Sequence, residues 1–255
     1  MIPRLQKRKN DGKAKHYDLW SSAGEEVRDG NSPCWESYPR PQMKRDSFFL
    51  LKEGWALDGE NIKIPFPPQA LLSGYQKEVG SHLTYDVDFC LPESFEKNRK
   101  NGRTLLHFGA VDQIAEVFLD DVFVGKHIGG YLPFSFDITD VIKGDREQEK
   151  KVHHLTVKVT DELDHTYPYG KQRKKRGGMW YTPVSGIWQS VWLEQVPNTY
   201  IKKVKLTPDL TGVDIELDIV KEVDQDASLT VTVNLGDGRF YSKKLDGMKG
   251  RLELK

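Results

Sequence analysis

Aromatic side chains are concentrated in residues 177–194, GGMWYTPVSGIWQSVWLE, which hold three of the six tryptophans of the chain. Such rings serve as core or as a flat platform for a ligand such as a sugar ring. Trp180 and Tyr181 lie in the first half, where Gly and Pro predict a loop and where functional residues collect. We therefore take Trp180 and Tyr181 as the candidate ligand contacts.

The second half of this stretch has the alternation of a strand that begins at Ile187. Ile187, Val191 and Leu193 fall on one face, and Trp188 and Trp192 on the other. Because apolar side chains occupy both faces, something must pack on each side. We expect Trp188 and Trp192 to be core or domain-interface residues rather than ligand contacts.

Basic residues fill five of the six positions of KQRKKR, residues 171–176, directly before the aromatic stretch. A phosphate or nucleic-acid site is one interpretation, and a mobile surface loop is the one we favour.

Carboxylates are the second candidate for chemistry. Asp112 and Glu116 in AVDQIAEV share strand parity, and glycoside hydrolysis uses two carboxylates roughly 5–10 Å apart. Capping and solvation explain the same spacing, so the pair is not assigned as catalytic. Ser185 in PVSGIW has no base nearby in the sequence and no nucleophile-elbow motif around it.

Metal and cofactor motifs are not found. His153 and His154 are adjacent, so on a strand they point to opposite faces and cannot share an ion. Cys34 and Cys90 lack metal spacing, and we expect both to be buried small hydrophobes. No glycine-rich loop joins a strand to a helix. The sequence predicts neither a metal nor a cofactor.

Composition narrows the class of protein. Lys+Arg and Asp+Glu number 38 each, which argues against a general nucleic-acid binder. No run approaches the ~18 apolar residues of a membrane span, and the N-terminus lacks the apolar core of a secretory signal. We expect a cytoplasmic protein with reduced thiols and no membrane or nucleic-acid partner.

Strands are predicted almost throughout. LTYDVDFCL and YLPFSFDI alternate with period two, RTLLHFGAV is apolar on both faces, and HLTVKVTDE is another strand. EVFLDDVFVG predicts a hairpin with Asp120-Asp121 at its turn, and DITDVIKGD a single helical turn. No helix of ten or more residues is expected. The fold class is therefore all-β, and a two-sheet jelly roll is expected for the first ~190 residues.

The chain divides into three predicted parts. Residues 1–37 are polar and predict an N-terminal arm, residues 38–197 form the jelly roll, and QVPNTY marks a boundary. Residues 198–255 alternate cleanly around a Gly-Asp-Gly turn, which is typical of a small sandwich. Only 56 residues follow Thr199, whereas a seven-stranded sandwich needs ~100. We expect an incomplete immunoglobulin-like sandwich, and hence the N-terminal piece of a longer protein.

Five segments occur in an order that resembles one known family. They resemble the N-terminal sugar-binding domain of glycoside hydrolase family 2, which includes β-galactosidases and β-glucuronidases. The resemblance covers about residues 38–197 and rests mainly on the last segment and on HFGAVD followed by GGYLPFSFDIT. The segments are RPQMKRDSFFLLKEGWALDG, IKIPFPPQALLSG, RTLLHFGAVDQIAEVFLDDVFVGKHIGGYLPFSFDIT, LTVKVTDELD and GGMWYTPVSGIWQSVWLEQVP.

This resemblance implies a jelly-roll domain, then an immunoglobulin-like sandwich, then a (β/α)8 barrel that holds both catalytic glutamates. A barrel needs ~250 residues of its own, so no catalytic residue is assigned here and the chain is expected to be inactive alone. The implied partners are a β-glycoside substrate and the barrel of a parent enzyme, and a homo-oligomer is also allowed.

Some family members place an acidic residue just ahead of the aromatic loop to line the sugar subsite. Here that position reads Gly177-Gly178-Met179-Trp180, without an acid. Trp180 or Tyr181 would then wall the sugar pocket, because the apolar face of a pyranose packs on an aromatic ring.

Three hypotheses remain open at this point. The chain is the non-catalytic front of a family 2 retaining β-glycosidase, a free-standing carbohydrate-binding module, or an interaction scaffold without sugar contact. The incomplete sandwich favours the first, and exposure of Trp180 and Tyr181 would favour the second.

Overall fold

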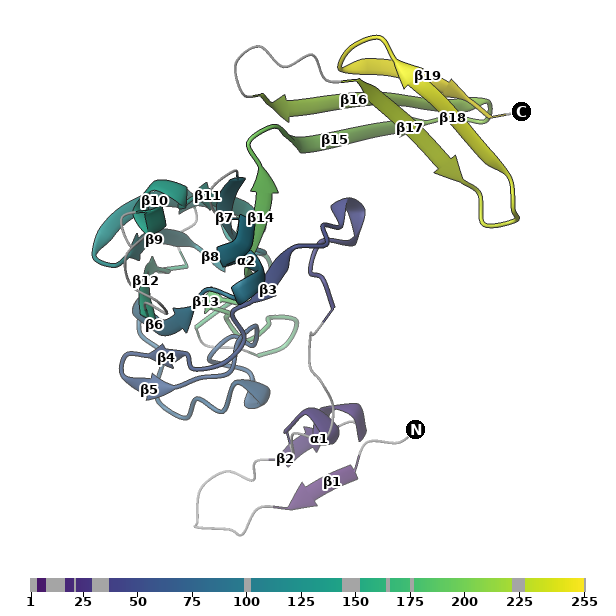
Figure 1. Ribbon diagram of the computed structural model, residues 1–255. Coiled ribbons are helices and arrows are strands. Elements are labelled where there is room, and N and C mark those ends of the chain that lie inside the picture. Colours follow the sequence, from purple (N-terminus) through teal and green to yellow (C-terminus); the bar gives the residue numbers. More distant parts are fainter. Residues whose placement is uncertain are drawn as a thin grey trace. The chain divides into compact units, whose positions relative to one another are not determined.

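Figure 1 shows a computed structural model of the chain, which describes residues 4–7, 17–20, 22–28, 37–98, 102–143, 152–163, 166–174, 177–221 and 228–254. Strands dominate it. The described α-helices are short: α1 (Ser22–Arg28), α2 (Glu93–Asn98) and α3 (Thr139–Lys143). The all-β prediction is confirmed. No helix among the described residues is long and apolar enough to cross a lipid bilayer.

The chain forms two compact units. The first contains residues 1–92 and 105–194, and the second contains residues 93–104 and 195–255.

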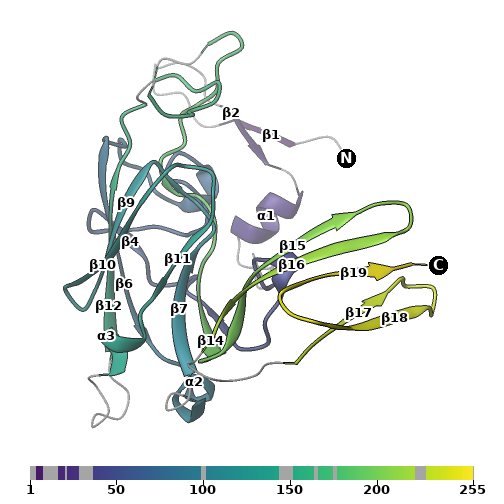
Figure 2. The ribbon, with the colours of Figure 1, turned by 90° about the horizontal axis from the view of Figure 1, so that it is seen from above.

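Two antiparallel sheets make up the body of the first unit, and Figure 2 shows them as facing layers. Two small strand pairs and two 3-10 helices, Pro41–Met43 and Leu71–Ser73, accompany them. The six-stranded sheet has the order β10 (Val122–Ile128), β9 (Ile114–Leu119), β12 (Val152–Thr160), β6 (His82–Cys90), β4 (Ala56–Leu57), β5 (Glu60–Asn61). The four-stranded sheet has the order β11 (Phe134–Asp137), β7 (Gly102–Phe108), β14 (Val191–Pro197), β3 (Phe48–Leu50). The small pairs are β8 (Val111–Asp112) with β13 (Gly186–Ile187), and β1 (Arg4–Lys7) with β2 (Tyr17–Trp20).

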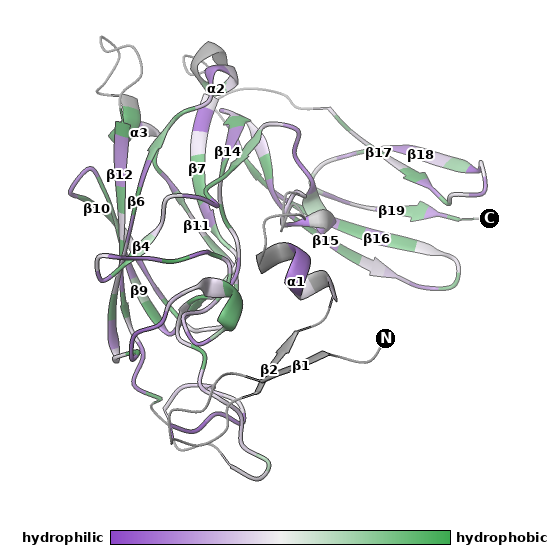
Figure 3. Ribbon diagram, turned by 90° about the horizontal axis from the view of Figure 1, so that it is seen from below, coloured by the Kyte–Doolittle hydropathy of each residue, from purple (hydrophilic) through white to green (hydrophobic). Residues whose placement is uncertain are grey.

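The core lies between the two layers, as the alternation predicts. In β6, every second side chain is buried: Leu83, Tyr85, Val87 and Phe89. β12 pairs with β6 on one side and β9 on the other, so its Leu155 lies between Val87 and Leu119. The alternation is visible as changing colour along strands such as β12 and β14 in Figure 3. One apolar face per strand therefore specifies the sandwich.

The β9–β10 hairpin and α3 confirm two local predictions. Asp120 and Asp121 both have positive φ, 50° and 62°, as a two-residue type I′ turn requires. The predicted helical turn is α3, where Thr139 N donates to Asp137 Oδ1 over 3.0 Å and so caps the first turn.

The prediction of one continuous strand from Ile187 is wrong, because the strand is interrupted. β13 ends at Ile187 and β14 begins only at Val191. In between, Gly109 N donates to Ser190 O over 2.9 Å. A Cβ on Gly109 would lie 2.6 Å from Gln189 Cβ, so the two backbones approach closely where the strand is interrupted.

The structure also bears on the cysteines and on the N-terminal arm. Cys90 is exposed, not buried, because it follows inward-facing Phe89 and so lies on the outer face of β6. Cys34 lies outside the described residues. Within the predicted arm, residues 1–37, the structure has the β1–β2 pair and α1.

The second unit contains α2, a three-stranded sheet and a hairpin. The sheet has the order β15 (Tyr200–Pro208), β16 (Gly212–Val220), β19 (Lys249–Glu253), and β17 (Leu229–Asn234) pairs with β18 (Phe240–Leu245). A small core joins sheet and hairpin through Val213, Ile215, Leu245 and Leu252. The predicted Gly-Asp-Gly turn is present, with φ of 78° at Gly236 and 92° at Gly238. The strands and this turn agree with the alternation predicted for residues 198–255.

Candidate functional site

The candidate sugar-contact residues lie in the later part of the connection between β12 and β13, where the structure describes residues 166–174 and 177–185. We call these residues the aromatic loop; it extends beyond the ends of the strands (Figure 2). Its two limbs are bound by their backbones: Tyr181 N donates to Lys171 O over 2.7 Å, and Arg173 N donates to Tyr181 O over 3.2 Å. Gly178, at φ 58°, allows the tight turn that Trp180 N closes by donating to Gly177 O.

Gln172 attaches the aromatic loop to the body of the first unit. Its Nε2 donates to Tyr169 O over 2.7 Å, and its Oε1 accepts from Val184 N over 2.5 Å. Its side chain also bonds to the carboxyl group of Asp112 on β8. A single amide therefore ties both limbs of the loop to the sandwich.

Gln69 and Ser185 form a second attachment. Gln69 Nε2 donates to Ser185 Oγ over 3.0 Å, and Ser185 N donates to Gln69 Oε1 over 3.1 Å. Ser185 is buried and bonded to an amide rather than to an imidazole. Its hydroxyl anchors the loop and has no nucleophilic geometry.

Tyr181 and Trp180 are presented differently. Tyr181 is 64% exposed, next to exposed Met179. Trp180 is half-buried, and the Arg173 guanidinium lies over its ring at 3.9 Å from the centroid. Tyr181 therefore offers an open ring, while one face of Trp180 is already covered. That these two residues contact a sugar stays a prediction.

The other two tryptophans of the stretch are part of the scaffold. Trp192 is 2% exposed and stacks on His107 with ring centroids 4.9 Å apart, which confirms its prediction as core. Trp188 is half-buried, and its Nε1 donates to Gly130 O over 2.8 Å. Its ring meets that of Tyr131 edge-on.

A pair of buried carboxyl groups lies beneath the aromatic loop. Asp112 on β8 is 4% exposed, and Asp161, at the end of β12, is 6% exposed. Burial, and then the charge of Asp161, raise the pKa of Asp112 to about 7, against the hydrogen bond from Gln172. Gly130 packs so closely on this carboxyl that an added Cβ would lie 2.2 Å from Asp112 Oδ1. Asp112 is thus held where its neutral form is favoured.

The structure does not bring the predicted parity pair together. Glu116 lies on β9, half-buried, with its Oε1 3.0 Å from Lys126 Nζ. Asp112 instead shares its site with Asp161, and the sequence carries no spacing signal for that pair. Gln172 was missed because the basic run was judged as a whole, although Gln172 is its one uncharged residue and is the one that turns inward.

Metal ligation finds no support among the residues described. In that part of the chain, no group of three or more His, Cys, Asp or Glu side chains could hold an ion. His153 is buried and His154 exposed, on opposite faces of β12 as expected.

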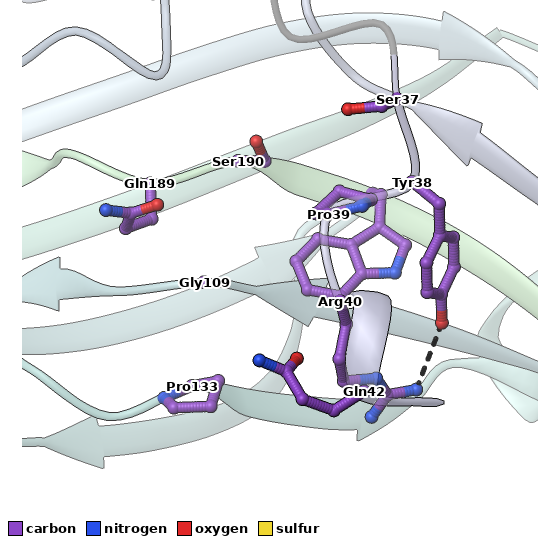
Figure 4. A pocket seen from close by; sticks show the side chains of 10 residues that line it. Ser37, Tyr38, Pro39, Arg40, Gln42, Gly109, Pro133, Gln189 and Ser190 are labelled. Carbon is purple, nitrogen blue, oxygen red and sulfur yellow. Dashed lines mark hydrogen bonds between the residues drawn. The ribbon is translucent and has the colours of Figure 1, made fainter. Parts of the chain in front are cut away.

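A pocket of about 480 Å³ opens in the first unit, apart from the aromatic loop (Figure 4). The dashed line in the figure marks the bond from Arg40 Nη2 to the hydroxyl of Tyr38, 3.3 Å long. Neither Trp180 nor Tyr181 lines this pocket. The lining residues are Ser37, Tyr38, Pro39, Arg40, Gln42, Gly109, Pro133, Gln189, Ser190 and Trp192.

The buried carboxylate of Glu194 holds this pocket's wall in place. Its side chain is 0% exposed and lies 3.1 Å from Arg40 Nη2 and 2.9 Å from Arg45 Nε. Tyr38, His107 and Trp192 also meet this carboxylate. Burial alone would raise the pKa of Glu194, but these partners outweigh it and lower the pKa to about 2. We read the cluster as structural, because its charges serve to fix residues 38–45 on the sheet.

The family can now be stated from comparison with known proteins. A sequence profile described as "Glycosyl hydrolases family 2, sugar binding domain" matches residues 61–197, more than half of the chain. The chain belongs to glycosyl hydrolase family 2. Its β-sandwich and the order of its motifs agree with that membership, so the resemblance stated from the sequence is confirmed.

Relatives of this family 2 domain are longer proteins. A β-galactosidase of Thermoanaerobacter pseudethanolicus is 32% identical over 185 residues, which are 69% of this chain and 23% of that protein. A β-glucuronidase of Canis lupus familiaris is 25% identical over 218 residues, 77% of this chain and 32% of that protein. The chain thus spans about a quarter to a third of these relatives.

The fold has counterparts among solved structures. A β-glucuronidase from Ruminococcus gnavus superposes with a TM-score of 0.60 at 20% identity, covering 86% of this chain and 40% of that one. At this identity the likeness concerns the fold alone. The match to both galactosidases and glucuronidases leaves the sugar to be determined from the site itself.

Proposed function

We propose that this chain is the N-terminal, non-catalytic part of a family 2 retaining β-glycosidase, where it forms scaffold and the rim of the sugar site. The observation that carries the proposal is the aromatic loop: an exposed Tyr181 on a backbone tied to the sandwich by Gln172 and Gln69. A rigid support of this kind suits a subsite that must be held in position.

Hydrolysis itself is assigned to a barrel domain, which the family resemblance implies. Asp112 and Asp161, whose carboxyl groups interact near Gln172 of the loop, are both buried. A glycosidic bond must lie between two accessible carboxyl groups, so this pair suits loop support and not catalysis. The chain alone is expected to leave p-nitrophenyl β-galactoside and β-glucuronide intact, and turnover by purified chain would contradict this assignment.

Sugar contact is tested by titrating the chain with methyl β-galactoside and methyl β-glucuronide while following the tryptophan indole NMR signals. We expect a saturable shift at Trp180, next to Tyr181, and none at Trp55, which is buried with its Nε1 donating to Leu51 O. Tyr181→Ala should abolish the shift at Trp180. Phe240→Ala, at a similarly exposed aromatic in the second unit, should leave it unchanged.

Two other outcomes would change the proposal. Unmoved signals up to tens of millimolar sugar would reduce the domain to scaffold. Tight binding by the chain alone would favour the second function class, a free-standing carbohydrate-binding module, which the exposure of Tyr181 also suits.

A further inference from the structure

The pocket of Figure 4 lies at one end of the four-stranded sheet of the first unit. Among its lining residues, Gly109 follows β7, Pro133 precedes β11, and Gln189 and Ser190 precede β14. Side chains of the segment 37–42 supply further lining. The volume of about 480 Å³ falls in the range of about 300–1,000 Å³ that is usual for small-molecule sites. The pocket therefore has room for a ligand of the size of a sugar.

Four side chains of the lining have polar groups that are available to a ligand: Ser37, Gln42, Gln189 and Ser190. In the part of the chain that the structure describes, no hydrogen bond links any of these side chains to another group. Free polar groups are ordinary on a protein surface, but these four converge on one hollow. Figure 4 shows Gln42 and Gln189 on different sides of it. Because amides and hydroxyls both donate and accept, the pocket suits a ligand rich in hydroxyl groups.

The charge of the lining favours a neutral ligand. Of the ten lining residues, only Arg40 is charged. Its Nη2 lies 3.1 Å from Glu194 Oε1 and donates to the Tyr38 hydroxyl over 3.3 Å. Arg45, the second arginine at Glu194, does not line the pocket. The one charge of the lining is thus paired, so it offers little attraction to an ionic ligand.

The lining also indicates binding rather than hydrolysis. A glycosidic bond is cleaved between two carboxyl groups. None of the ten described residues around this pocket is Asp or Glu. We therefore assign no reaction to it.

The wall that carries Gln42 is fixed before any ligand arrives. Residues 41–43 form a 3-10 helix, in which Met43 N donates to Arg40 O over 3.1 Å. Tyr38 and Arg40, at the start of this wall, are both bound to the buried carboxylate of Glu194.

The opposite wall is fixed through the sheet. Gly109 N donates to Ser190 O over 2.9 Å, next to Gln189. The backbones pack so closely here that a Cβ on Gly109 would lie 2.6 Å from Gln189 Cβ. A pocket with fixed walls loses little conformational entropy on binding, which favours a preformed site.

We propose that this pocket is a binding site for a neutral saccharide, in which Gln42 and Gln189 bind hydroxyl groups of the sugar and Pro39 and Pro133 contact the apolar face of its ring. A pyranose suits such a lining, because its hydroxyl groups lie around the edge of the ring and its C–H groups form apolar faces. The site goes beyond the proposed function, which concerns the aromatic loop, and neither depends on the other.

A short peptide is the competing ligand, since side-chain amides also bind backbone groups. A peptide that adds to a sheet needs a free strand edge, whereas this pocket lies at the ends of three strands. The geometry thus favours the saccharide, and peptide binding becomes an outcome of the test.

The test is an NMR titration of the whole chain that follows the side-chain amide signals of Gln42 and Gln189 and the indole signals of Trp192 and Trp180. The neutral probes are methyl β-glucoside, methyl β-galactoside and cellobiose. Methyl β-glucuronide is the charged counterpart of the first, and N-acetylprolinamide represents a peptide. We expect a neutral sugar to cause saturable shifts of both amide signals and of Trp192, which lines the pocket. Because the charge of the lining is paired, the affinity should change less than about twofold in about 0.5 M salt, and the glucuronide should bind no more tightly than the glucoside.

Variants locate the site. Gln42→Ala with Gln189→Ala should weaken binding about tenfold or more, because two hydrogen bonds to the ligand are lost. Both side chains are exposed, so the urea midpoint should not change. The matched control is Gln76→Ala, an exposed glutamine of the first unit outside this lining, which should leave the affinity unchanged. The affinity of every variant is followed at the Trp192 indole, which all of them retain.

Several results would overturn the inference. Unmoved pocket signals with every neutral sugar up to tens of millimolar would reject the site, and so would a double variant that binds like the wild type. Tighter binding of the glucuronide that is lost at high salt would show an anion site, and tighter binding of N-acetylprolinamide a peptide site.

The two indoles separate this inference from the proposed function. A shift at Trp180 alone would support the aromatic loop as a sugar contact and reject the pocket. Shifts at Trp192, Gln42 and Gln189 alone would support the pocket and leave the aromatic loop as scaffold.

Discussion

Replacing Glu194 by Gln should cost the first unit about 3 kcal/mol of its free energy of unfolding. The carboxylate is fully buried against Arg40, Arg45 and His107, and its pKa is lowered from 4.5 to about 2. A difference of about 2.5 pKa units corresponds to about 3 kcal/mol. Removing one partner of a buried ion pair costs about 3–5 kcal/mol by itself. The pKa shift and the cost of breaking a buried ion pair thus give a similar loss of stability.

Urea unfolding followed by tryptophan fluorescence measures this loss. All six tryptophans fall in residues 1–92 and 105–194, so the signal reports the first unit alone. The matched control is Glu116→Gln, because the side chain of Glu116 is 42% exposed and its pair with Lys126 is worth below about 1 kcal/mol. Equal losses in the two variants, or a loss below about 1 kcal/mol for Glu194→Gln, would refute the reasoning.

The same variant predicts a pH dependence. Because the folded pKa of Glu194 lies below its unfolded value of about 4.5, its stabilisation is present above that pH and is lost as pH falls toward about 2. The difference in unfolding free energy between wild type and Glu194→Gln should therefore narrow across this window. A gap that stays constant from pH 7 to pH 2 would mean that the carboxylate is not held ionised by its partners.

The remaining predictions concern the aromatic loop and its support. Asp112→Asn should raise the unfolding free energy at pH 8 by up to about 4 kcal/mol, since a rise in pKa from 3.8 to about 7 spans about three units. The pKa of Asp112 is higher in the folded than in the unfolded protein, so its ionisation destabilises the fold. The stability gained by Asp112→Asn should therefore grow between pH 4 and 7 and vanish below pH 4 when it is measured by urea unfolding. A gain at pH 3 would contradict this prediction. Gly130→Ala should destabilise the first unit by about 1–3 kcal/mol through the clash with Asp112, whereas Gly177→Ala, with open space around its Cα, should change the melting temperature little. Tyr181→Ala should leave the urea midpoint unchanged, because the ring is exposed, while it abolishes the indole shift on sugar titration.

Local patterns predicted the sandwich well, because its strands each bury one face. The alternation in LTYDVDFCL identifies the buried side chains of β6, and Asp120-Asp121 identifies the β9–β10 turn. Both depend on neighbours within a few residues. The prediction that Cys90 is buried was wrong, because it was made from the residue type alone. Its position in the alternation of β6, directly after buried Phe89, places its side chain on the outer face.

The support of the candidate site depends instead on contacts between distant segments. Asp112 and Asp161 are brought together by the pairing of β8 and β9 with their neighbours, and Gln69 reaches Ser185 across more than a hundred residues. The gap between β13 and β14 likewise follows from the close approach of Gly109 to Gln189. A pattern read along the chain contains no information on such pairs.

Polar ties help to position the aromatic loop. Met179 and Tyr181 are exposed, so burial of their side chains contributes little to its order. What holds the limbs is Gln172, whose one amide meets Tyr169, Val184 and Asp112. Since each such bond contributes only about 1 kcal/mol, the protonation of Asp112 matters to the loop as much as any single contact. The Gln172 side chain turns toward the sandwich, while its neighbours Lys171 and Arg173 are exposed. This short segment therefore presents a neutral amide to the core and positive charges to the solvent.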